Sequence, residues 1–411
     1  MKKIFALALA LMMVLAAFAG CANDATEPTE TPVGTEAPEG TEAPATTDTP
    51  DAAEPAEGET LIIGGIGPLT GDYATYGVSV KQGAEMAVKE INEAGGVNGI
   101  TFQLLFEDDQ TDAEMAVNAY NKLMDNGMQV SLGAVTSGAC IAVSEVSKED
   151  GILMLTPSGS QVECIQYDNG FRICFADPEQ GVNAAKFIAE NGLATKIAII
   201  YDKSNDYSNG IKENFVTAAA DLGLEIVSEQ AFTNQSNTDF SVQLQAIAGS
   251  GAELIFLPIY AQEAAYILTQ AQSAGMEQTF FGGDGLDGIL EKIGADNVSA
   301  TEGVMFLTPF DPNADEQNIK FTSDYQAAYG ATPDQFAADG YDAIYTIKAA
   351  LEQSGAKPSD SDFNEKMIAA MTEITVDGTT GTMQWDASGA PSKAAAVVVL
   401  RDGAPTPYTA E

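Results

Sequence analysis

The feature that most constrains the fold is a repeated alternation of short β-rich runs and helical patterns after residue 60. "LIIGGIG" at 61–67 predicts a strand, and a helix follows in which Val80, Ala84, Ala87 and Ile91 recur at helical spacing. The same order repeats as far as "TFFGGDG" at 279–285. Alternating strands and helices predict parallel sheets covered on both faces. The strands are too many for one ordinary open sheet, and 411 residues suffice for two domains. We therefore predict an α/β protein with two doubly wound parallel sheets.

Polar, glycine-containing segments follow the predicted strands. In an open parallel sheet, ligands bind beyond the carboxyl ends of the strands. The segments are "GPLTGDYATYG" (67–77), "TSGAC" (136–140), "TPSGS" (156–160), "DKSNDYSNG" (202–210) and "GGDG" (282–285). They predict a ligand site at that end of the sheets.

Three serines in these segments are candidates for binding an anion. Ser137 immediately precedes a predicted helix, and Ser158 and Ser160 lie in the turn after Pro157. Helix N-termini and exposed backbone N–H groups favour anions, so together these groups could hold a carboxylate without a basic residue. The alternative is that they are ordinary N-caps and turn residues.

An acid and two tyrosines are further candidates. Asp284 lies between glycines just after an apolar strand and could accept hydrogen bonds from an ammonium group; a plain turn aspartate is the alternative. Tyr76 and Tyr207 could donate a hydroxyl or line a pocket, although aromatic residues near helix starts are also common in cores.

Composition excludes several function classes. The formal net charge of −42 disfavours binding to nucleic acid. The sequence has no histidine, which excludes any Ser-His or Cys-His triad within it. "GGIGPLTG" lacks the Lys-Ser/Thr pair of a phosphate-binding loop, and no acidic or cysteine group has a metal-binding spacing. We therefore expect neither a cofactor nor a metal.

The N-terminus has the pattern of a secretory signal. "MKK" precedes an apolar run that ends in "FAGC", which resembles the lipobox of bacterial lipoproteins. We predict a signal peptide at 1–20 and lipidation of Cys21; an ordinary secretory signal or an uncleaved anchor is the alternative. Residues 21–59 are rich in Pro, Thr, Glu and Ala and predict a disordered acidic tether.

Several stretches together carry a family resemblance. They include "IGPLTGDYATYG", "GAEMAVKEINEAGGVNG", "FEDDQTDAEMAVNAYNKLM", "GILMLTPSGS", "FRICFADPEQG" and "FFGGDG". The sequence from about residue 60 to its end resembles the periplasmic-binding-protein type I family, and within it the substrate-binding lipoproteins of branched-chain amino-acid ABC transporters. This implies two lobes joined by three crossovers that close on a ligand. The implied boundaries are 60–177 with 309–391 for lobe 1, and 178–308 with 392–411 for lobe 2.

The resemblance also implies roles for particular residues. In the family, the positions that match one group bind the ligand's α-carboxylate and help to hold its amino group: Ser137, Ser158, Gly159 and Ser160. Tyr207 and Asp284 match residues that approach from the other lobe, with the acid facing the ammonium group. Tyr76 matches a wall of the side-chain pocket. Several relatives carry glutamate where this sequence has Asp284.

The function implied is non-enzymatic. The protein would capture a small amino acid outside the cytoplasm, tethered by its lipid anchor as a monomer, and deliver it to an ABC permease. Two alternatives stay open: a sensory receptor of the same fold, and an extracytoplasmic α/β enzyme, which would have to work without histidine.

Three cysteines follow Cys21 in the chain. Cys164 and Cys174 flank the loop "IQYDNGFRI", and we predict a disulfide between them. A Cys140–Cys164 pair is the alternative, and three reduced thiols are the third possibility.

The lipid anchor gives the first testable prediction. Cys21→Ser should move the protein from the membrane fraction to the soluble extracytoplasmic fraction, because the acyl chains attached at Cys21 are the anchor. Fractionation followed by immunoblotting measures this, with Cys140→Ser as the matched control. A Cys21→Ser variant that stays in the membrane fraction would rule out lipidation at Cys21.

Overall fold

The computed structural model describes residues 58–410. The predicted signal peptide, Cys21 and nearly all of the predicted tether lie outside these residues. Within 58–410, no helix has the length and apolar character that a membrane crossing requires.

The first sheet has five parallel strands in the order β2-β1-β3-β4-β5. The strands are β1 (Thr60–Gly67), β2 (Thr101–Asp108), β3 (Val130–Leu132), β4 (Met154–Thr156) and β5 (Gly170–Arg172). Leu61 and Ile63 point to one face, and Ile66 points to the other, as the alternation of a strand requires. The first face packs against α1 (Ala74–Glu93), α10 (Gln335–Ser354) and α11 (Phe363–Met371). The second packs against α2 (Ala113–Asp125) and α3 (Ser137–Asp150).

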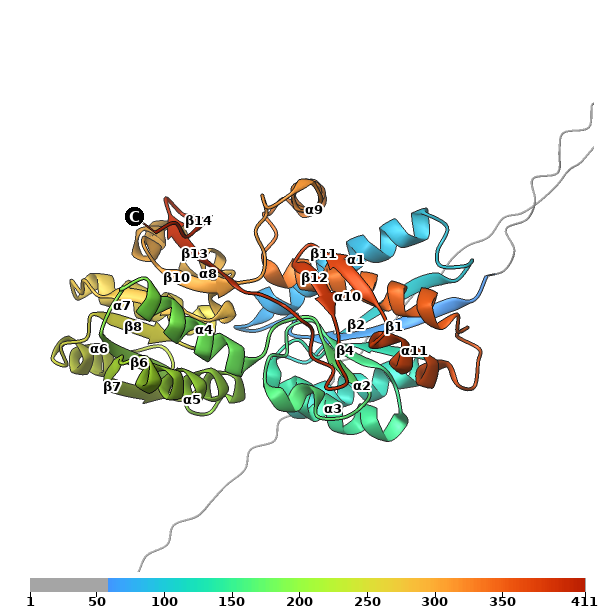
Figure 1. The fold of residues 1–411 in the computed structure, drawn as a ribbon, viewed down its shortest axis with the longest axis horizontal. Helices are drawn as coiled ribbons and strands as arrows, with labels where there is room; N and C mark the ends of the chain where they lie inside the picture. The colour runs from blue at the N-terminus through green and yellow to red at the C-terminus, as the bar shows by residue number, and fades with distance from the viewer. Residues whose placement is uncertain (1–57, 411) are drawn as a thin grey trace, which may run out of the picture. The chain divides into compact units, whose positions relative to one another are not determined.

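The second sheet has seven strands in the order β14-β13-β10-β9-β8-β6-β7. Five are parallel: β6 (Lys196–Asp202), β7 (Glu225–Phe232), β8 (Leu254–Leu257), β9 (Thr279–Gly282) and β10 (Met305–Thr308). Its helices include α4 (Asp177–Glu190), α5 (Asp206–Asp221), α6 (Ser241–Ala248) and α7 (Ala261–Ser273) (Figure 1). The predicted α/β class with two parallel-sheet units is confirmed.

The edge of the second sheet departs from a purely parallel arrangement. β13 (Ala396–Arg401) pairs antiparallel with β10, and β14 (Ala404–Pro407) pairs antiparallel with β13. The turn between them is Asp402-Gly403, and both residues have positive φ angles of 51° and 74°. An Asp-Gly pair in this conformation favours a tight hairpin.

The remaining elements are short or peripheral. They are η1 (Val162–Ile165), η2 (Asp284–Leu286), α8 (Ile289–Ile293), η3 (Ala295–Thr301), α9 (Glu316–Tyr329), and the hairpin of β11 (Thr375–Gly378) with β12 (Gly381–Gln384).

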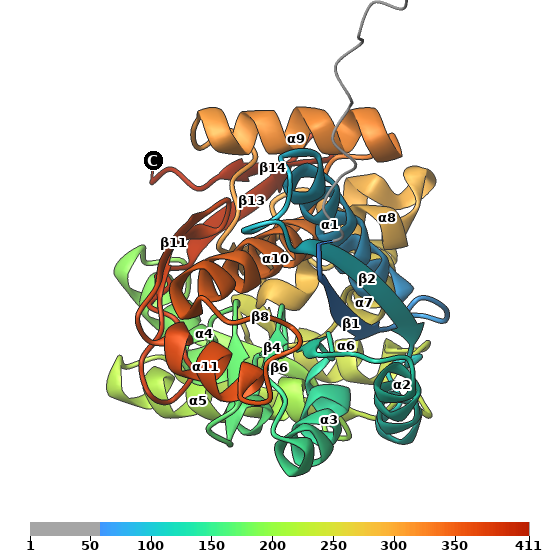
Figure 2. The ribbon, with the colours of Figure 1, turned by 90° about the vertical axis from the view of Figure 1, so that its right-hand side faces the viewer.

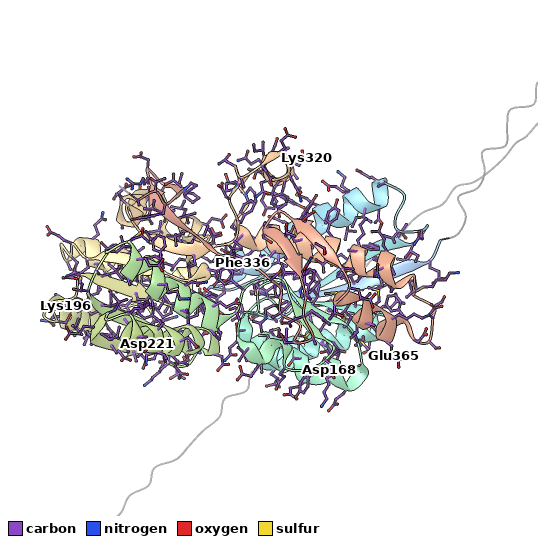
Figure 3. All side chains as sticks on the ribbon, in the orientation of Figure 1. Asp168, Lys196, Asp221, Lys320, Phe336 and Glu365 are labelled. Carbon is purple, nitrogen blue, oxygen red and sulfur yellow. The ribbon has the colours of Figure 1, made fainter. Side chains whose placement is uncertain are left out.

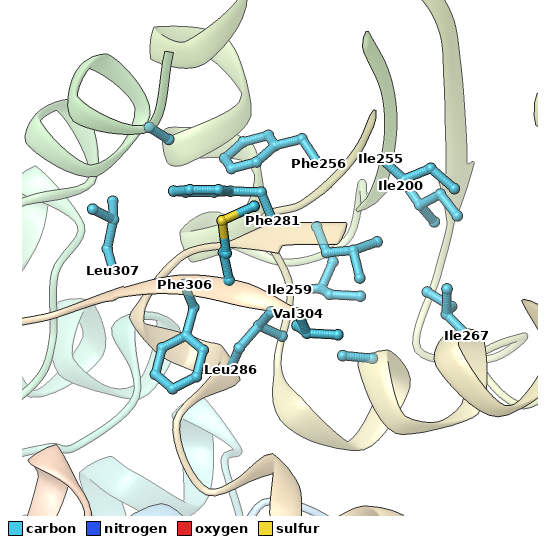
Figure 4. Close-up of a cluster of buried hydrophobic side chains, with 14 of the residues drawn as sticks. Ile200, Ile255, Phe256, Ile259, Ile267, Phe281, Leu286, Val304, Phe306 and Leu307 are labelled. Carbon is cyan, nitrogen blue, oxygen red and sulfur yellow. The ribbon is translucent and has the colours of Figure 1, made fainter. Parts of the chain in front are cut away.

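The central strands β8 and β10 of the second sheet are short, mainly apolar and fully buried. All four residues of β8 are buried, as expected of a strand covered on both faces. Phe256 of β8, Phe281 of β9 and Phe306 of β10 are among the large side chains that fill this core (Figure 4). Because these strands are buried in the core, it is the loops after them that can contribute residues to a site.

Two glycines let α1 and α10 pack with their backbones in contact (Figure 2). A Cβ atom on Gly83 would lie 1.9 Å from the carbonyl oxygen of Ala337, and one on Gly340 would lie 2.3 Å from that of Val80. Neither distance is compatible with a side chain. The start of α10, with Gln335 and Phe336, is therefore fixed against α1.

A buried ion pair lies where the chain passes between the two sheets. Lys393, which precedes β13, is 3.0 Å from Asp339 of α10 and donates to the carbonyl of Ile173, which follows β5, at 2.8 Å. Both charged side chains are almost completely buried. We propose that two lobes form around the two sheets with the boundaries given above, and that this pair ties two of the crossovers together.

Candidate functional site

A small cavity lies among the loops that follow strands of both sheets. It contains about 260 Å³ of space between atoms, a figure that includes space open to solvent. The residues that line it are Tyr76, Val135, Thr136, Ser137, Ser158, Tyr207, Tyr260, Asp284, Gly285 and Phe336. The cavity thus lies where ligands bind in open parallel sheets.

One end of the cavity is acidic. Asp284 begins η2 directly after β9 and is 2% exposed. Its carboxylate accepts hydrogen bonds from the Tyr207 hydroxyl at 2.8 Å and from the Gln335 amide at 3.3 Å. Among the ion pairs of residues 58–410, none involves Asp284. A buried carboxylate held only by neutral donors is suited to receive a cationic group.

Burial raises the pKa of Asp284 above its ordinary value, and the hydrogen bond from Tyr207, the largest opposing influence, offsets only part of this shift. A cation placed beside the carboxylate would lower that pKa again. An ammonium group beside Asp284 would therefore favour the ionised carboxylate.

Hydroxyl groups and a helix N-terminus form the other end. Thr136 is the N-cap residue of α3, but its side chain makes no capping hydrogen bond, and its Oγ1 has no partner within 58–410. The Oγ of Ser160, in the adjoining loop but not in the lining of the cavity, is likewise buried without a partner there. Ser137 accepts a hydrogen bond from the Gln161 N–H at 3.3 Å, which leaves the Ser137 hydroxyl proton available. Free hydroxyl donors beside the first turn of a 14-residue helix are suited to an anion.

Aromatic rings form the walls between these two ends. Tyr207 stacks on Tyr260 with ring centroids 4.9 Å apart, and Tyr76 packs edge-on against Phe336 at 4.6 Å. The Tyr76 hydroxyl donates to the carbonyl of Gly285 at 2.7 Å and accepts from the Ala261 N–H at 2.8 Å. Tyr76 therefore joins α1 to η2 and α7, and its ring rather than its hydroxyl faces the cavity.

The structure brings five of the seven predicted ligand residues to this cavity: Tyr76, Ser137, Ser158, Tyr207 and Asp284. Gly159 and Ser160 are buried in the same loop but are not among the lining residues. The Gly159 N–H is occupied by Thr156 Oγ1 at 2.8 Å. The roles assigned to all seven stay predictions.

Part of the cavity lining was not predicted from the sequence. Tyr260 follows β8, so the rule that ligands bind beyond strand ends could have found it. Thr136 is next to Ser137 and carried the same signal. Phe336 follows no strand, because it begins α10, and nothing in its local sequence marks it as a pocket residue.

Asp177, at the start of α4, is a further unpredicted acid near the site. Its side chain is 0% exposed, and neither carboxylate oxygen has a hydrogen-bond partner among the described residues. Burial raises the pKa of Asp177 well above its ordinary value, and the adjacent Ser160 hydroxyl opposes this shift only in part. Burial thus favours the neutral form of the Asp177 carboxyl group.

The predicted Cys164–Cys174 disulfide is absent from the structure, in which Cys140, Cys164 and Cys174 are buried free thiols. The Cys164 thiol lies 3.6 Å from the carbonyl of Ser137, on the side of α3 that carries Cys140. Cys174 follows β5 at the other end of the intervening loop. The prediction is therefore corrected to three free thiols.

A cavity with an acidic end, a hydroxyl end and aromatic walls, set between two α/β sheets, defines a receptor for a small polar solute. Comparisons agree with this class. The sequence model of the family described as "Periplasmic binding protein" matches residues 60–404. The chain belongs to this family, whose membership implies an extracytoplasmic location and a solute-binding rather than an enzymatic role.

Individual relatives make the likeness more specific. The chain is 33% identical to Leu/Ile/Val-binding protein homolog 3 of Brucella melitensis biotype 1 over 301 residues, covering 72% of this chain and 80% of the relative. It is 30% identical to the leucine-, isoleucine-, valine-, threonine- and alanine-binding protein of Pseudomonas aeruginosa over 80% of this chain and 87% of the relative.

Among solved structures, the chain resembles the branched-chain amino acid transporter substrate binding protein LivJ from Streptococcus pneumoniae in complex with isoleucine. The TM-score is 0.78 at 26% identity, and the match covers 84% of this chain and 98% of that chain.

The acidic end gives the second prediction. Asp284→Asn should weaken leucine binding by about 2–5 kcal/mol, because the ligand's ammonium group loses its charged partner in a closed site.

The same residue predicts a pH dependence. In the unmodified protein, the affinity for leucine should fall as the pH is lowered through the raised pKa of Asp284, since the neutral acid attracts the ammonium group less. The Asp284→Asn variant should lack this pH-dependent component. Calorimetry at several pH values measures both effects. Asp221→Asn, an exposed aspartate at the end of α5, is the control (Figure 3). Unchanged affinity in Asp284→Asn would make Asp284 a turn residue only.

Proposed function

We propose that the protein is an extracytoplasmic solute-binding lipoprotein that captures a branched-chain amino acid and delivers it to the permease of an ABC transporter. The observation that carries this proposal is that one cavity has an acidic end and, opposite it, an end formed by hydroxyl groups and a helix N-terminus. Asp284 would face the ligand's ammonium group, and the hydroxyls of Thr136, Ser137 and Ser160 with the α3 N-terminus would face its carboxylate.

The walls of the cavity support an apolar side chain on the ligand. Tyr76, Tyr260 and Phe336 present ring surface to the cavity. Relatives named for leucine, isoleucine and valine binding point to the same ligand class. Leucine, isoleucine and valine share two charged ends and a compact branched side chain, and these match the three parts of the site.

The transport role is supported by the family and by the transporter context of the LivJ structure. The permease would recognise the ligand-bound protein, and Cys21 would hold the protein at the membrane through its acyl chains. A catalytic role is disfavoured because the sequence lacks histidine and because the family binds solutes.

The ligand class gives the third prediction. Calorimetry should detect leucine, isoleucine or valine with a dissociation constant of about 1 μM or tighter, equivalent to about −8 kcal/mol. 4-Methylpentanoate lacks the ammonium group and 3-methylbutylamine lacks the carboxylate, so each should bind at least about tenfold more weakly than leucine, since each leaves one polar end of the site unpaired.

Benzoate and glucose serve as controls for a different solute class. Heat of binding from either of them, with none from the branched-chain amino acids, would contradict the proposed ligand while leaving the family assignment intact.

A further inference from the structure

A buried guanidinium group lies directly behind the hydroxyl end of the cavity. Arg172 ends β5, and its side chain is 2% exposed. Its two terminal nitrogens donate to the carbonyl oxygens of four consecutive residues. Nη1 reaches Gly159 and Ser160, and Nη2 reaches Gln161 at 3.1 Å and Val162 at 3.4 Å. These residues continue the loop "TPSGS" that carries Ser158 and Ser160.

The backbone from which this side chain extends is fixed in place. The backbone N–H of Arg172 donates to the carbonyl of Gly389 at 3.1 Å, and the Trp385 indole donates to the carbonyl of Arg172 at 2.7 Å. The backbone of β5 also pairs in parallel with β4. A charged group anchored on a sheet holds a loop more rigidly than contacts within that loop would.

The charge of Arg172 is not compensated by an ion pair within residues 58–410. Asp177 interacts with it electrostatically, but burial raises the pKa of Asp177 well above its ordinary value and so disfavours the charged form of this acid. The direct hydrogen bonds of the guanidinium group are with carbonyl dipoles. Such a buried charge creates a favourable potential for an anion on the other side of the loop.

The hydrogen bonds from Arg172 also determine which polar groups of the loop can face an anion. Carbonyl oxygens that faced the cavity would repel a carboxylate, and Arg172 holds four of them on its own side. The Oγ of Ser160 has no hydrogen-bond partner among the described residues, and it lies beside the Asp177 carboxyl group. The same side chain thus removes acceptors from the site and adds positive potential to it.

We propose that Arg172 is a positioning residue that makes the site selective for ligands with a free carboxylate, by orienting the loop at 159–162 and by its charge. The inference rests on the proposed function, because it assigns the ligand's carboxylate to the hydroxyl end. A purely structural arginine would support the binding of every ligand equally.

The test compares leucine with leucinamide, which keeps the ammonium group and the side chain but has no carboxylate. Calorimetry or ligand-induced thermal shift is measured on the unmodified protein, on Arg172→Gln and on Arg172→Lys. Arg401→Gln removes an exposed arginine of β13 and is the matched control.

We expect Arg172→Gln to weaken leucine binding by roughly 10- to 100-fold and leucinamide binding by less than about threefold, so that the preference for leucine shrinks. Arg172→Lys keeps the charge but lacks the planar fork that contacts four carbonyls, so its preference should be intermediate. Arg401→Gln should change neither ligand.

Equal weakening of both ligands, or no change in the preference, would overturn the proposal. If Arg172→Gln does not fold, Arg172→Lys decides by the same comparison, and failure of both to fold would assign Arg172 a structural role only. The preference ratio does not test the proposed function itself. That function would be overturned if the unmodified protein bound none of leucine, isoleucine and valine.

Discussion

The site depends on one buried carboxylate that has no basic partner within the described part of the chain. Asp284 is held by the hydroxyl of Tyr207 and the amide of Gln335, and these neutral donors leave its charge uncompensated. A protein gains nothing in stability from such a group, because burial disfavours the charged form. The arrangement becomes favourable when a ligand supplies the cation. The reverse holds behind the hydroxyl end. Arg172 is buried there without an ion pair to any residue of 58–410, and a ligand carboxylate would supply the opposite charge.

The scaffold keeps these groups in place through contacts between distant parts of the chain. Gly83 and Gly340 let α1 and α10 meet closely, which fixes Gln335 and Phe336 at the cavity. The Tyr76 hydroxyl then joins α1 to η2 and α7. The buried Lys393–Asp339 pair holds the segment before β13 against α10 and the end of β5. Positions of ligand-facing groups are thus set by packing and hydrogen bonds rather than by the loops alone.

Much of the fold and part of the site could be predicted from the sequence. The strand–helix alternation predicted the parallel sheets, and the polar loops after strands predicted Ser137, Ser158, Tyr207 and Asp284 as cavity residues.

Other features were not predicted. The antiparallel edge of β13 and β14 was missed, because a short apolar run before Asp402-Gly403 does not specify its pairing partner. Phe336 and Arg172 were missed for a related reason. Both residues act through tertiary contacts, with residues far along the chain or with the carbonyl groups of a loop. The local sequence pattern does not indicate such contacts. Cysteine pairing failed likewise, since proximity in sequence did not decide which thiols are neighbours.

The most direct measurement is a crystal structure of the complex with leucine, at a resolution that distinguishes the two ends of the ligand. The account predicts the ammonium nitrogen within about 3 Å of an Asp284 carboxylate oxygen, with the carboxylate against Ser137, Ser160 and the N-terminus of α3. The side chain should lie among Tyr76, Tyr260 and Phe336. A leucine bound in the reverse orientation, or bound outside this cavity, would contradict the account.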